Sequence, residues 1–234
     1  MKSRGLSLLF GLMICTTVQA FSPGRPDESD SLIRLQKSRF LVYYNINKNC
    51  PALVCWSLSK TDLGHHRRPA GQSFLTDPAC PRPRAKSSDY TRTGYQRGHL
   101  CPSADRSANI ELMRATFVMS NVAPMCPGLN MQGFAQAEEH CRALAWANHR
   151  CLLVAGAFFS SDSLRYLGKS SVGIPDSFFR ACIVPDAPEL SVYWLFPNDT
   201  KATREATFRV SSSAFASSLR RKVLNIIKEL YKSW

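Results

Sequence analysis

Two short apolar runs near the start of the chain have the composition of β-strands. They are RFLVYYNIN (39–47) and PALVCWSLSK (51–60), which are rich in β-branched and aromatic residues and are separated by KNC. Two such runs with a short connection predict a pair of strands. The preceding residues 21–38 are polar, contain prolines and show no period, so we expect them to form a flexible lead-in.

The second half of the chain alternates between helical and strand-like patterns. CLLVAGAFF (151–159) is almost wholly apolar and predicts a buried strand, and SFFRACIVP (177–185) followed by SVYWLFPN (191–198) predicts an antiparallel pair. Apolar residues recur at helical spacing over residues 130–149, and residues 212–234 predict a basic amphipathic helix. This mixture predicts an α+β class and a single domain that begins at residue 39.

The middle of the chain is less regular. Residues 61–93 are dense in Pro, Gly and Arg, and loops of this length are usually functional or mobile. GYQRGHL (94–100) predicts a short strand, and after it we expect a helical turn and a short strand around residues 117–119.

The first twenty residues have the pattern of a cleaved export signal. The basic MKSR precedes the apolar GLSLLFGLMICTTV, and VQA then offers residues that suit a signal peptidase, so we expect cleavage after Ala20. The apolar run is shorter than the about 20 residues that a membrane anchor needs. We therefore expect a secreted or periplasmic protein that has no stable membrane association after the signal is removed.

The chain is strongly basic. It has 30 Lys and Arg residues against 17 Asp and Glu residues, a formal net charge of +13, which loss of Lys2 and Arg4 with the signal lowers by two. A surface this positive attracts polyanions, which include nucleic acid, anionic membranes and sulfated sugars. Charge alone does not choose among them.

The cysteine count changes in the same way. The signal contains Cys15, and its removal leaves eight of the nine cysteines. An even number in an exported chain predicts up to four disulfides, whose pairing the sequence leaves open. A zinc site is the alternative, but the chain contains no CxxC pair.

The candidate chemistry is the hydrolysis of a phosphodiester. This reaction needs a base to deprotonate water, positive groups to neutralise the phosphate, and help for the leaving oxygen. His99 in QRGH can serve as the base, and Arg97 would lie on the same face of a strand. Asn121, Asn130 and Glu138 follow, and an Asn oxygen suits a hard divalent cation that keeps most of its water. Taken singly, each residue has an ordinary structural explanation, and only the joint spacing favours a site.

That spacing resembles the DNA/RNA non-specific endonuclease family of the ββα-metal (His-Me finger) superfamily. The resemblance rests on GYQRGHLCPSADR, TFVMSNVAPMCPGLNMQGFAQAEE, VGIPDSFFRACIVPD and VYWLFPN, and it covers residues 39–210. The family reads D-R-G-H, then S-N, then an Asn nine residues later and a Glu eight residues beyond it. The resemblance implies a ββα-metal nuclease fold with a central antiparallel sheet flanked by helices.

The resemblance also implies a role for each residue at these positions. His99 is the implied general base and Asn130 the implied magnesium ligand, with Mn2+ as a substitute for Mg2+. Arg97 is the implied phosphate contact, Asn121 supports the site, and Glu138 orients a water of the metal or a partner group.

Two departures from the family pattern affect the expected activity. Gln96 stands where the family has Asp, so a hydrogen-bonding amide replaces a charge. The arginine that the family has before the VCWSL strand is missing, so this phosphate clamp is either lost or supplied by one of the arginines at 67, 68, 82 or 84. Of these, Arg82 and Arg84 are our candidates for substrate binding.

The sequence therefore predicts an exported metal-dependent endonuclease that cleaves DNA and RNA with little sequence preference. One alternative is a secreted cationic nucleic-acid-binding homologue that has lost catalysis. A third hypothesis, a thiol hydrolase built on Cys101 beside His99, is disfavoured because pairing explains an even set of exported cysteines better.

Overall fold

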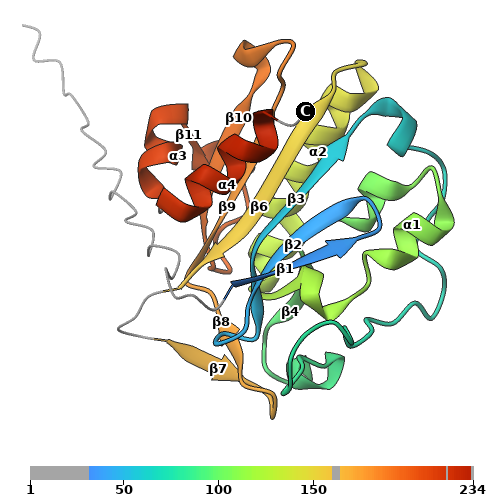
Figure 1. Ribbon diagram of the computed structural model, residues 1–234, viewed down its shortest axis with the longest axis vertical. Helices are drawn as coiled ribbons and strands as arrows, with labels where there is room; N and C mark the ends of the chain where they lie inside the picture. The colour runs from blue at the N-terminus through green and yellow to red at the C-terminus, as the bar shows by residue number, and fades with distance from the viewer. Residues whose placement is uncertain (1–31, 160–163, 220, 233–234) are drawn as a thin grey trace, which may run out of the picture.

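A seven-stranded antiparallel sheet forms the centre of the molecule. The computed structural model describes residues 32–159, 164–219 and 221–232. The order of the strands across the sheet is β1-β2-β3-β6-β9-β10-β11 (Figure 1). Their bounds are β1 Leu32–Lys37, β2 Phe40–Asn45, β3 Cys50–Leu58, β6 Cys151–Phe158, β9 Ser177–Ile183, β10 Val192–Pro197 and β11 Arg209–Val210.

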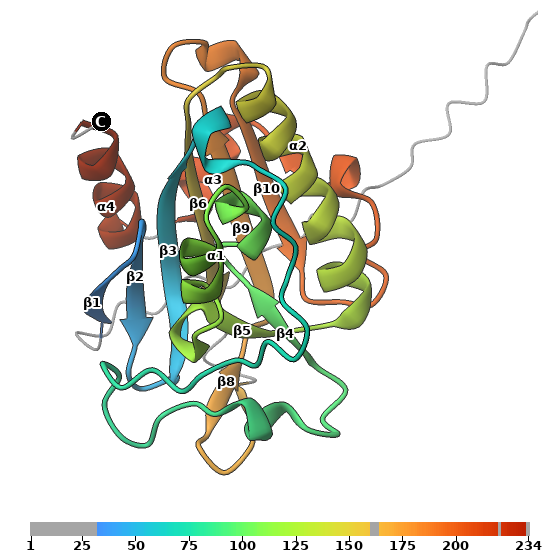
Figure 2. The same ribbon diagram turned by 90° about the vertical axis from the view of Figure 1, so that its right-hand side faces the viewer.

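Helices and smaller strands cover the two faces of this sheet (Figure 2). One face carries α1 (Ile110–Ala115), α2 (Phe134–Trp146) and the two-stranded sheet of β4 (Gln96–His99) and β5 (Val122–Met125). The opposite face carries α3 (Ser212–Ser218) and α4 (Arg221–Lys232). A small hairpin of β7 (Arg165–Leu167) and β8 (Val172–Ile174) projects from one end of the molecule (Figure 1).

This double coverage explains why the central strands are almost wholly apolar. In β9, Phe178 packs with Phe134 of α2 on one face, whereas the next residue, Phe179, packs with Phe215 of α3 on the other. Successive side chains of a strand point to opposite faces, so a strand that is covered twice buries nearly every side chain, and in β9 these include the charged Arg180. The predicted buried strand and the predicted antiparallel pair are β6, β9 and β10, with β9 and β10 paired from Ser177 to Cys182.

Three expectations about the chain's elements need correction. Residues 32–37 are not part of a flexible lead-in, because they form β1, which pairs antiparallel with β2 through a tight turn. The strand expected around residues 117–119 lies at β5 instead, and Val118 forms only an isolated bridge with Leu75. The C-terminal helix is two helices, because the extended backbone of Leu219 (ψ 143°) ends α3. The expected signal peptide and residues 21–31 lie outside the described residues.

The structure pairs none of the cysteines that it describes. All eight that follow the expected signal are free thiols, and seven of them are buried. The structure therefore does not show the predicted disulfides, and Cys182 forms hydrogen bonds with Cys141 and Cys151 in the core. No group of His, Cys, Asp and Glu within the described ranges could hold a metal ion. None of the helices in these ranges is long and apolar enough to cross a membrane.

Candidate active site

The candidate residues lie on a ββα unit made of β4, β5 and α2. β4 and β5 pair antiparallel, with Gln96 opposite Met125 and His99 opposite Val122. Gly98 permits this pairing, because a Cβ added there would lie 2.8 Å from the Met125 side chain. A π-helical turn, Leu129–Gly133, then leads directly into α2. Such turns occur frequently at functional sites.

His99 is enclosed by two aromatic rings. The centroids of the Phe74 and Phe117 rings each lie 4.8 Å from that of its imidazole. Burial, together with the positive charge of Arg68, lowers the pKa of His99 to about 3. The ring is therefore neutral at physiological pH, and its Nε2 is buried without a hydrogen-bond partner. A buried polar atom without a partner requires an explanation, and a role as a proton acceptor supplies one.

Arg68 is the arginine whose charge acts on His99. Its guanidinium carbon lies 4.9 Å from the Phe117 ring centroid and 5.7 Å from that of Phe74. Its Nη2 donates a hydrogen bond of 2.7 Å to the Gln72 carbonyl, which fixes the side chain at the mouth of the site. Of the four arginines that could replace the missing clamp, the structure brings Arg68 to His99. The sequence could not single it out, because 30 residues of largely irregular chain separate it from His99.

Arg97 and Asn130 share an open pocket with Arg68. The pocket has a volume of about 460 Å3 and is also lined by Gln96 and Phe74. Two nitrogens of Arg97, Nε and Nη2, donate to the Ser87 carbonyl at 3.2 and 2.5 Å, and its guanidinium lies over the Tyr90 ring. The pocket therefore presents two arginines to an anion.

Asn130 has the orientation that a cation ligand needs. Its Nδ2 donates a hydrogen bond of 2.7 Å to Oε1 of Gln96, whose own Nε2 lies 3.1 Å from the Met131 sulfur. No hydrogen bond within the described part of the chain engages Asn130 Oδ1. A carbonyl oxygen left free beside a polar pocket fits a hard cation that takes one or two protein ligands and keeps its remaining waters. The departure at Gln96 thus preserves an acceptor for the Asn130 amide.

Asn121 lies beneath the base rather than in the pocket. It is fully buried, its Oδ1 accepts from the Cys101 backbone nitrogen at 2.9 Å, and its Nδ2 donates to the carbonyls of Cys101 and Thr116. These bonds fix the backbone two residues after His99. Asn121 therefore holds the backbone next to His99 in place and does not line the pocket.

Glu138 also acts at a distance from the pocket. Its carboxylate is 16% exposed and lies 3.7 Å from Arg180 and 3.9 Å from Arg142. Burial raises the pKa of Glu138 to about 7, and the positive charge of Arg180 opposes this rise. Arg180 in turn donates a long hydrogen bond of 3.4 Å to the carbonyl of Leu100, the residue after the base. Of the two implied roles, the structure therefore favours the orientation of a partner group.

Two positioning residues were not identified from the sequence. Arg180 is fully buried in β9, where its single charge within SFFRACI was the available signal. Asn198 follows β10, and its side chain bonds to the Cys126 nitrogen and to the carbonyls of Pro124 and Pro175. Asn198 thereby fixes the end of β5, from which the chain runs to Asn130.

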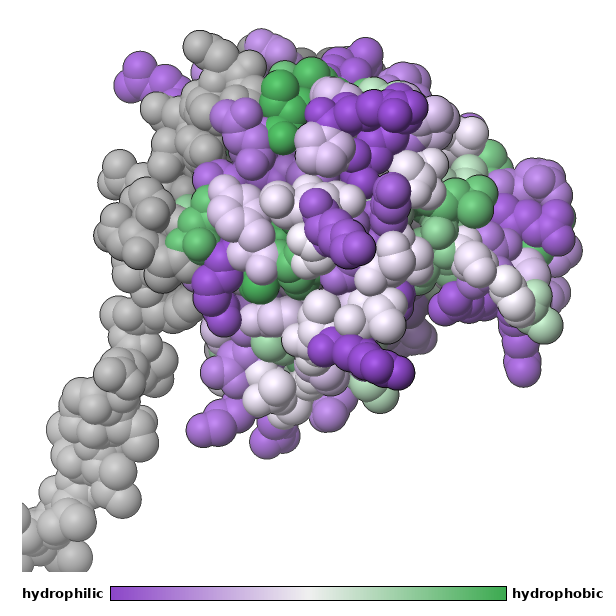
Figure 3. Space-filling view, turned by 90° about the horizontal axis from the view of Figure 1, so that it is seen from below, coloured by the Kyte–Doolittle hydropathy of each residue, from purple (hydrophilic) through white to green (hydrophobic). Residues whose placement is uncertain are grey.

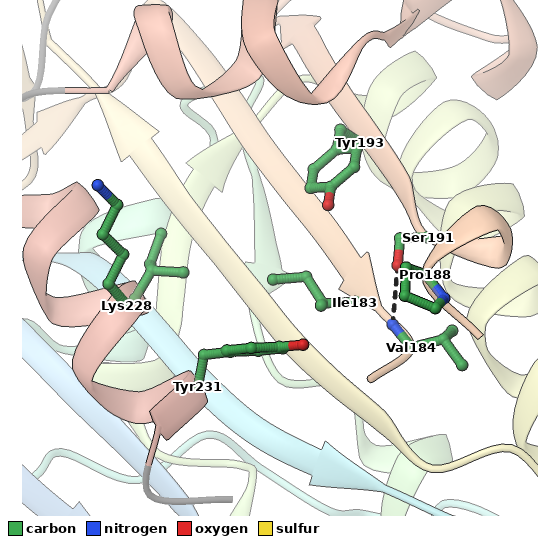
Figure 4. Close-up of a pocket in the computed structure, with 8 residues that line it drawn as sticks. Ile183, Val184, Pro188, Ser191, Tyr193, Lys228 and Tyr231 are labelled. Atoms are coloured by element: carbon green, nitrogen blue, oxygen red, sulfur yellow. Dashed lines mark hydrogen bonds between the residues drawn. The ribbon is translucent and has the colours of Figure 1, made fainter. Parts of the chain in front are cut away.

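The rival sites lack the required chemistry. The Cys101 thiol is buried, and this burial raises its pKa to about 12, so it is not a nucleophile at neutral pH. An apolar pocket of about 350 Å3 lies between α4 and the β9–β10 pair, with Ile183, Tyr193 and Tyr231 around it (Figure 4). No histidine or carboxylate lines it. The ββα unit is therefore the candidate active site.

Comparisons with known proteins agree with this geometry. A sequence model described as DNA/RNA non-specific endonuclease matches residues 19–222. A nuclease from Nostoc sp. is 33% identical over 154 residues, which cover 65% of this chain and 54% of that protein. Human mitochondrial endonuclease G is 32% identical over 127 residues, which cover 49% of this chain and 42% of that protein. The chain thus spans about half the length of these relatives or less.

The fold has a counterpart among solved structures. A chain from a crystal structure of the EndoG/EndoGI complex, which concerns the inhibition of EndoG, superimposes with a TM-score of 0.69. The match covers 79% of this chain and 82% of that chain at 20% sequence identity, so it bears on the fold alone. The central antiparallel sheet, the flanking helices and the β4–β5–α2 unit are those of a ββα-metal nuclease fold. By its sequence and its fold, this chain belongs to the DNA/RNA non-specific endonuclease family, as the spacing of His99, Asn130 and Glu138 predicted.

Proposed function

We propose that this protein is an exported magnesium-dependent endonuclease that hydrolyses phosphodiester bonds in DNA and RNA with little sequence preference. One observation carries the proposal. A neutral, unpartnered His99 packs against Phe74 and feels the charge of Arg68, and both of these residues line a pocket together with Asn130. A base, an anion clamp and a free oxygen for a cation are the parts that the reaction needs.

In this proposal His99 takes the proton of the attacking water. The low pKa keeps the ring neutral before substrate binds. An arriving phosphate brings negative charge, which favours the protonated ring and raises the pKa toward the range of an effective base. Asn121 and Arg180 hold the backbone of Leu100 and Cys101, so that the ring keeps its position during the transfer.

Arg68 and Arg97 bind the non-bridging oxygens of the scissile phosphate. Asn130 would hold the divalent cation through Oδ1, and Gln96 would keep that oxygen free by accepting the hydrogen bond of the Asn130 Nδ2. When bound, Mg2+, or Mn2+ in its place, supplies electrostatic stabilisation of the negative charge that builds on the phosphate and the leaving oxygen. These groups contact phosphate, and phosphate contacts carry no sequence information, which accounts for low sequence preference.

Export and the wider substrate surface also belong to the proposal. The composition of residues 1–20 supports a cleaved signal and a secreted or periplasmic location. The strongly basic chain suits DNA and RNA as partners. Arg82 and Arg84 are proposed to contact phosphates away from the scissile bond.

The test is plasmid nicking by the purified protein across a magnesium titration, with and without EDTA. We expect cutting that EDTA abolishes, and Asn130→Ala should raise the magnesium needed for half-maximal activity or end turnover. Gln132→Ala is the matched control, because Gln132 is exposed on the same helical turn. Undiminished cutting in excess EDTA would rule out the metal scheme, and binding without any cutting would identify a homologue that has lost catalysis.

A further inference from the structure

A second basic pocket lies beside the candidate active site. It has a volume of about 660 Å3, within the range of about 300–1,000 Å3 that is usual for ligand pockets. Four of its seven lining residues are cationic, and none is acidic. They are Arg82, Arg84, Lys86 and Lys169, together with Thr76, Pro83 and Ser170.

A buried carboxylate holds two separate segments together to form this pocket. Oδ2 of Asp89 accepts a hydrogen bond of 2.8 Å from the Lys86 backbone nitrogen, and its Oδ1 accepts one of 3.2 Å from the Ser170 nitrogen. Gly168, with φ +67°, permits the approach, because a Cβ there would lie 2.2 Å from the Asp89 Cβ. The β7–β8 hairpin, which carries Lys169, is therefore fixed against the segment that carries Lys86 (Figure 2). The proximity of these lysines is built into the fold.

The charges of this pocket are available to a ligand. Arg84 uses Nε and Nη2 to bind the carbonyls of Cys80 and Pro78, which fixes its guanidinium in place. Arg82, Lys86 and Lys169 are exposed, and no carboxylate of the described residues forms an ion pair with them. The end of the molecule from which the hairpin projects is largely hydrophilic or neutral, with green residues only in scattered patches (Figure 3). Cations gathered in a pocket without acids favour an anionic ligand.

The pocket adjoins the active site through consecutive residues. Lys86 lines the basic pocket, whereas Ser87 lines the active-site pocket, where its carbonyl binds Arg97. Because Lys86 directly precedes the residue whose carbonyl holds Arg97, the two pockets meet at this point of the chain. A polynucleotide bound at Arg97 can therefore continue along this segment toward Lys86 and Lys169.

We propose that this pocket, here called the distal phosphate pocket, binds a backbone phosphate of a polynucleotide next to the scissile one. The proposal rests on the proposed nuclease function and names its substrate class, which is a polymer rather than a dinucleotide. Lys86 and Lys169 are the central groups, because two different segments present them to one ligand.

The test compares two double variants that lose the same charge. Lys86→Ala with Lys169→Ala removes the distal phosphate pocket, whereas Arg221→Ala with Lys222→Ala removes two exposed cations from α4, on the opposite face of the sheet. The affinity for a 20-nucleotide oligothymidylate is measured against salt, in each variant combined with His99→Ala. The plot of log affinity against log salt has a slope of about −0.7 per phosphate contact on single strands. The Lys86/Lys169 variant should flatten it by about 0.7 to 1.4, and the α4 variant should not.

A second readout is the ratio of kcat/KM for the 20-nucleotide substrate to that for a dinucleotide, each variant now carrying an intact His99. This ratio should fall at least about threefold in the Lys86/Lys169 variant and stay constant in the α4 variant. An unchanged slope and ratio would overturn the distal phosphate pocket while leaving the nuclease function intact. Lost binding to heparin or to anionic vesicles with unchanged oligonucleotide binding would overturn it as well, in favour of another polyanion. A wild-type protein that cleaves neither substrate would refute the proposed function, and the salt slope would still test the pocket.

Discussion

The imidazole of His99 stays neutral because its surroundings oppose a positive charge in two ways. The rings of Phe74 and Phe117 remove water from the imidazole, and Arg68 repels a second positive charge. The same residues thus prepare the base and restrict access to it. An exposed histidine in QRGH would have neither property.

We expect an NMR titration to show the His99 ring neutral down to about pH 3. An unfolded histidine binds a proton below about pH 6.5, so the unfolded state binds more protons between these values. The free energy of unfolding should therefore fall as the pH is lowered from about 6.5 toward 3. Arg68→Ala should raise the pKa of His99 part of the way to 6.5, and Arg67→Ala, an exposed neighbour, serves as the control. A ring that titrates near 6.5 in the wild-type protein would show that the enclosure is wrong.

Gln96 should control the affinity of the cation through Asn130. Gln96→Leu removes the acceptor for the Asn130 amide, and the loss of such a supporting bond weakens a metal site by about tenfold or more. Gln96→Glu keeps the acceptor and adds a negative charge, so it should strengthen binding. Electron paramagnetic resonance of Mn2+ measures the cation affinity of both variants, and the His99→Ala background prevents turnover during the measurement. Equal Mn2+ affinity in all three proteins would leave Gln96 without this role.

At the scale of elements, buried hydrogen bonds fix the segments that flank the paired strands β4 and β5. Asn121 supplies three of them, two to Cys101 and one to Thr116. Arg180 of β9 forms an ion pair with Glu138 of α2, which ties this helix to the central sheet. Asn198, at the end of β10, bonds to Pro124 of β5. The proposed catalytic groups are few, and the residues that hold them in place come from many elements.

Asn121→Ala should lower the free energy of unfolding by about 2–4 kcal/mol, because it leaves buried backbone groups without partners. It should lower kcat more than it raises KM, since the base is displaced while the phosphate clamps remain. Urea denaturation and steady-state kinetics measure the two effects. Asn121→Asp, which keeps the acceptor for the Cys101 nitrogen, should recover part of the stability. A loss below about 0.5 kcal/mol would mean that these bonds do not hold the strand.

The elements that the sequence predicted well are strands that are buried on both faces, because burial makes their residues apolar along most of the strand. β6 is apolar throughout and β9 is largely apolar because both faces of these strands are buried, and β2 and β3 carry the β-branched and aromatic residues of such strands. β1 was missed because it is an edge strand that is only partly buried. The break at Leu219 depends on how α3 and α4 each pack on the sheet, which no local pattern records.

At the scale of the whole molecule, the central sheet lies between the candidate active site and the helices α3 and α4. The ββα unit and both polar pockets lie on or beside one face, whereas α3 and α4 cover the other with Phe215, Val223 and Ile227. The order of the family motif predicted His99, Asn121, Asn130 and Glu138. It could not predict Arg68, Arg180 or the distal phosphate pocket, because long-range packing of loops and strands creates them.

This separation makes a prediction for α4. Ile227→Ala should lower the free energy of unfolding by about 2–4 kcal/mol, because it opens a cavity in the core of that face. The magnesium concentration for half-maximal cleavage should not change, and Lys228→Ala, an exposed neighbour, should alter neither quantity. Urea denaturation and a magnesium titration give both values. A shifted magnesium requirement in Ile227→Ala would show that the two faces are coupled.

The central claim is that His99 deprotonates the attacking water, and single-turnover cleavage of duplex DNA by wild type and His99→Ala tests it most directly. With saturating magnesium, the variant should cleave about a hundredfold more slowly or worse, the range expected for a lost general base. Its affinity for the same DNA should match that of the wild type, because the clamps at Arg68 and Arg97 remain. Cleavage at the wild-type rate by His99→Ala would contradict the account.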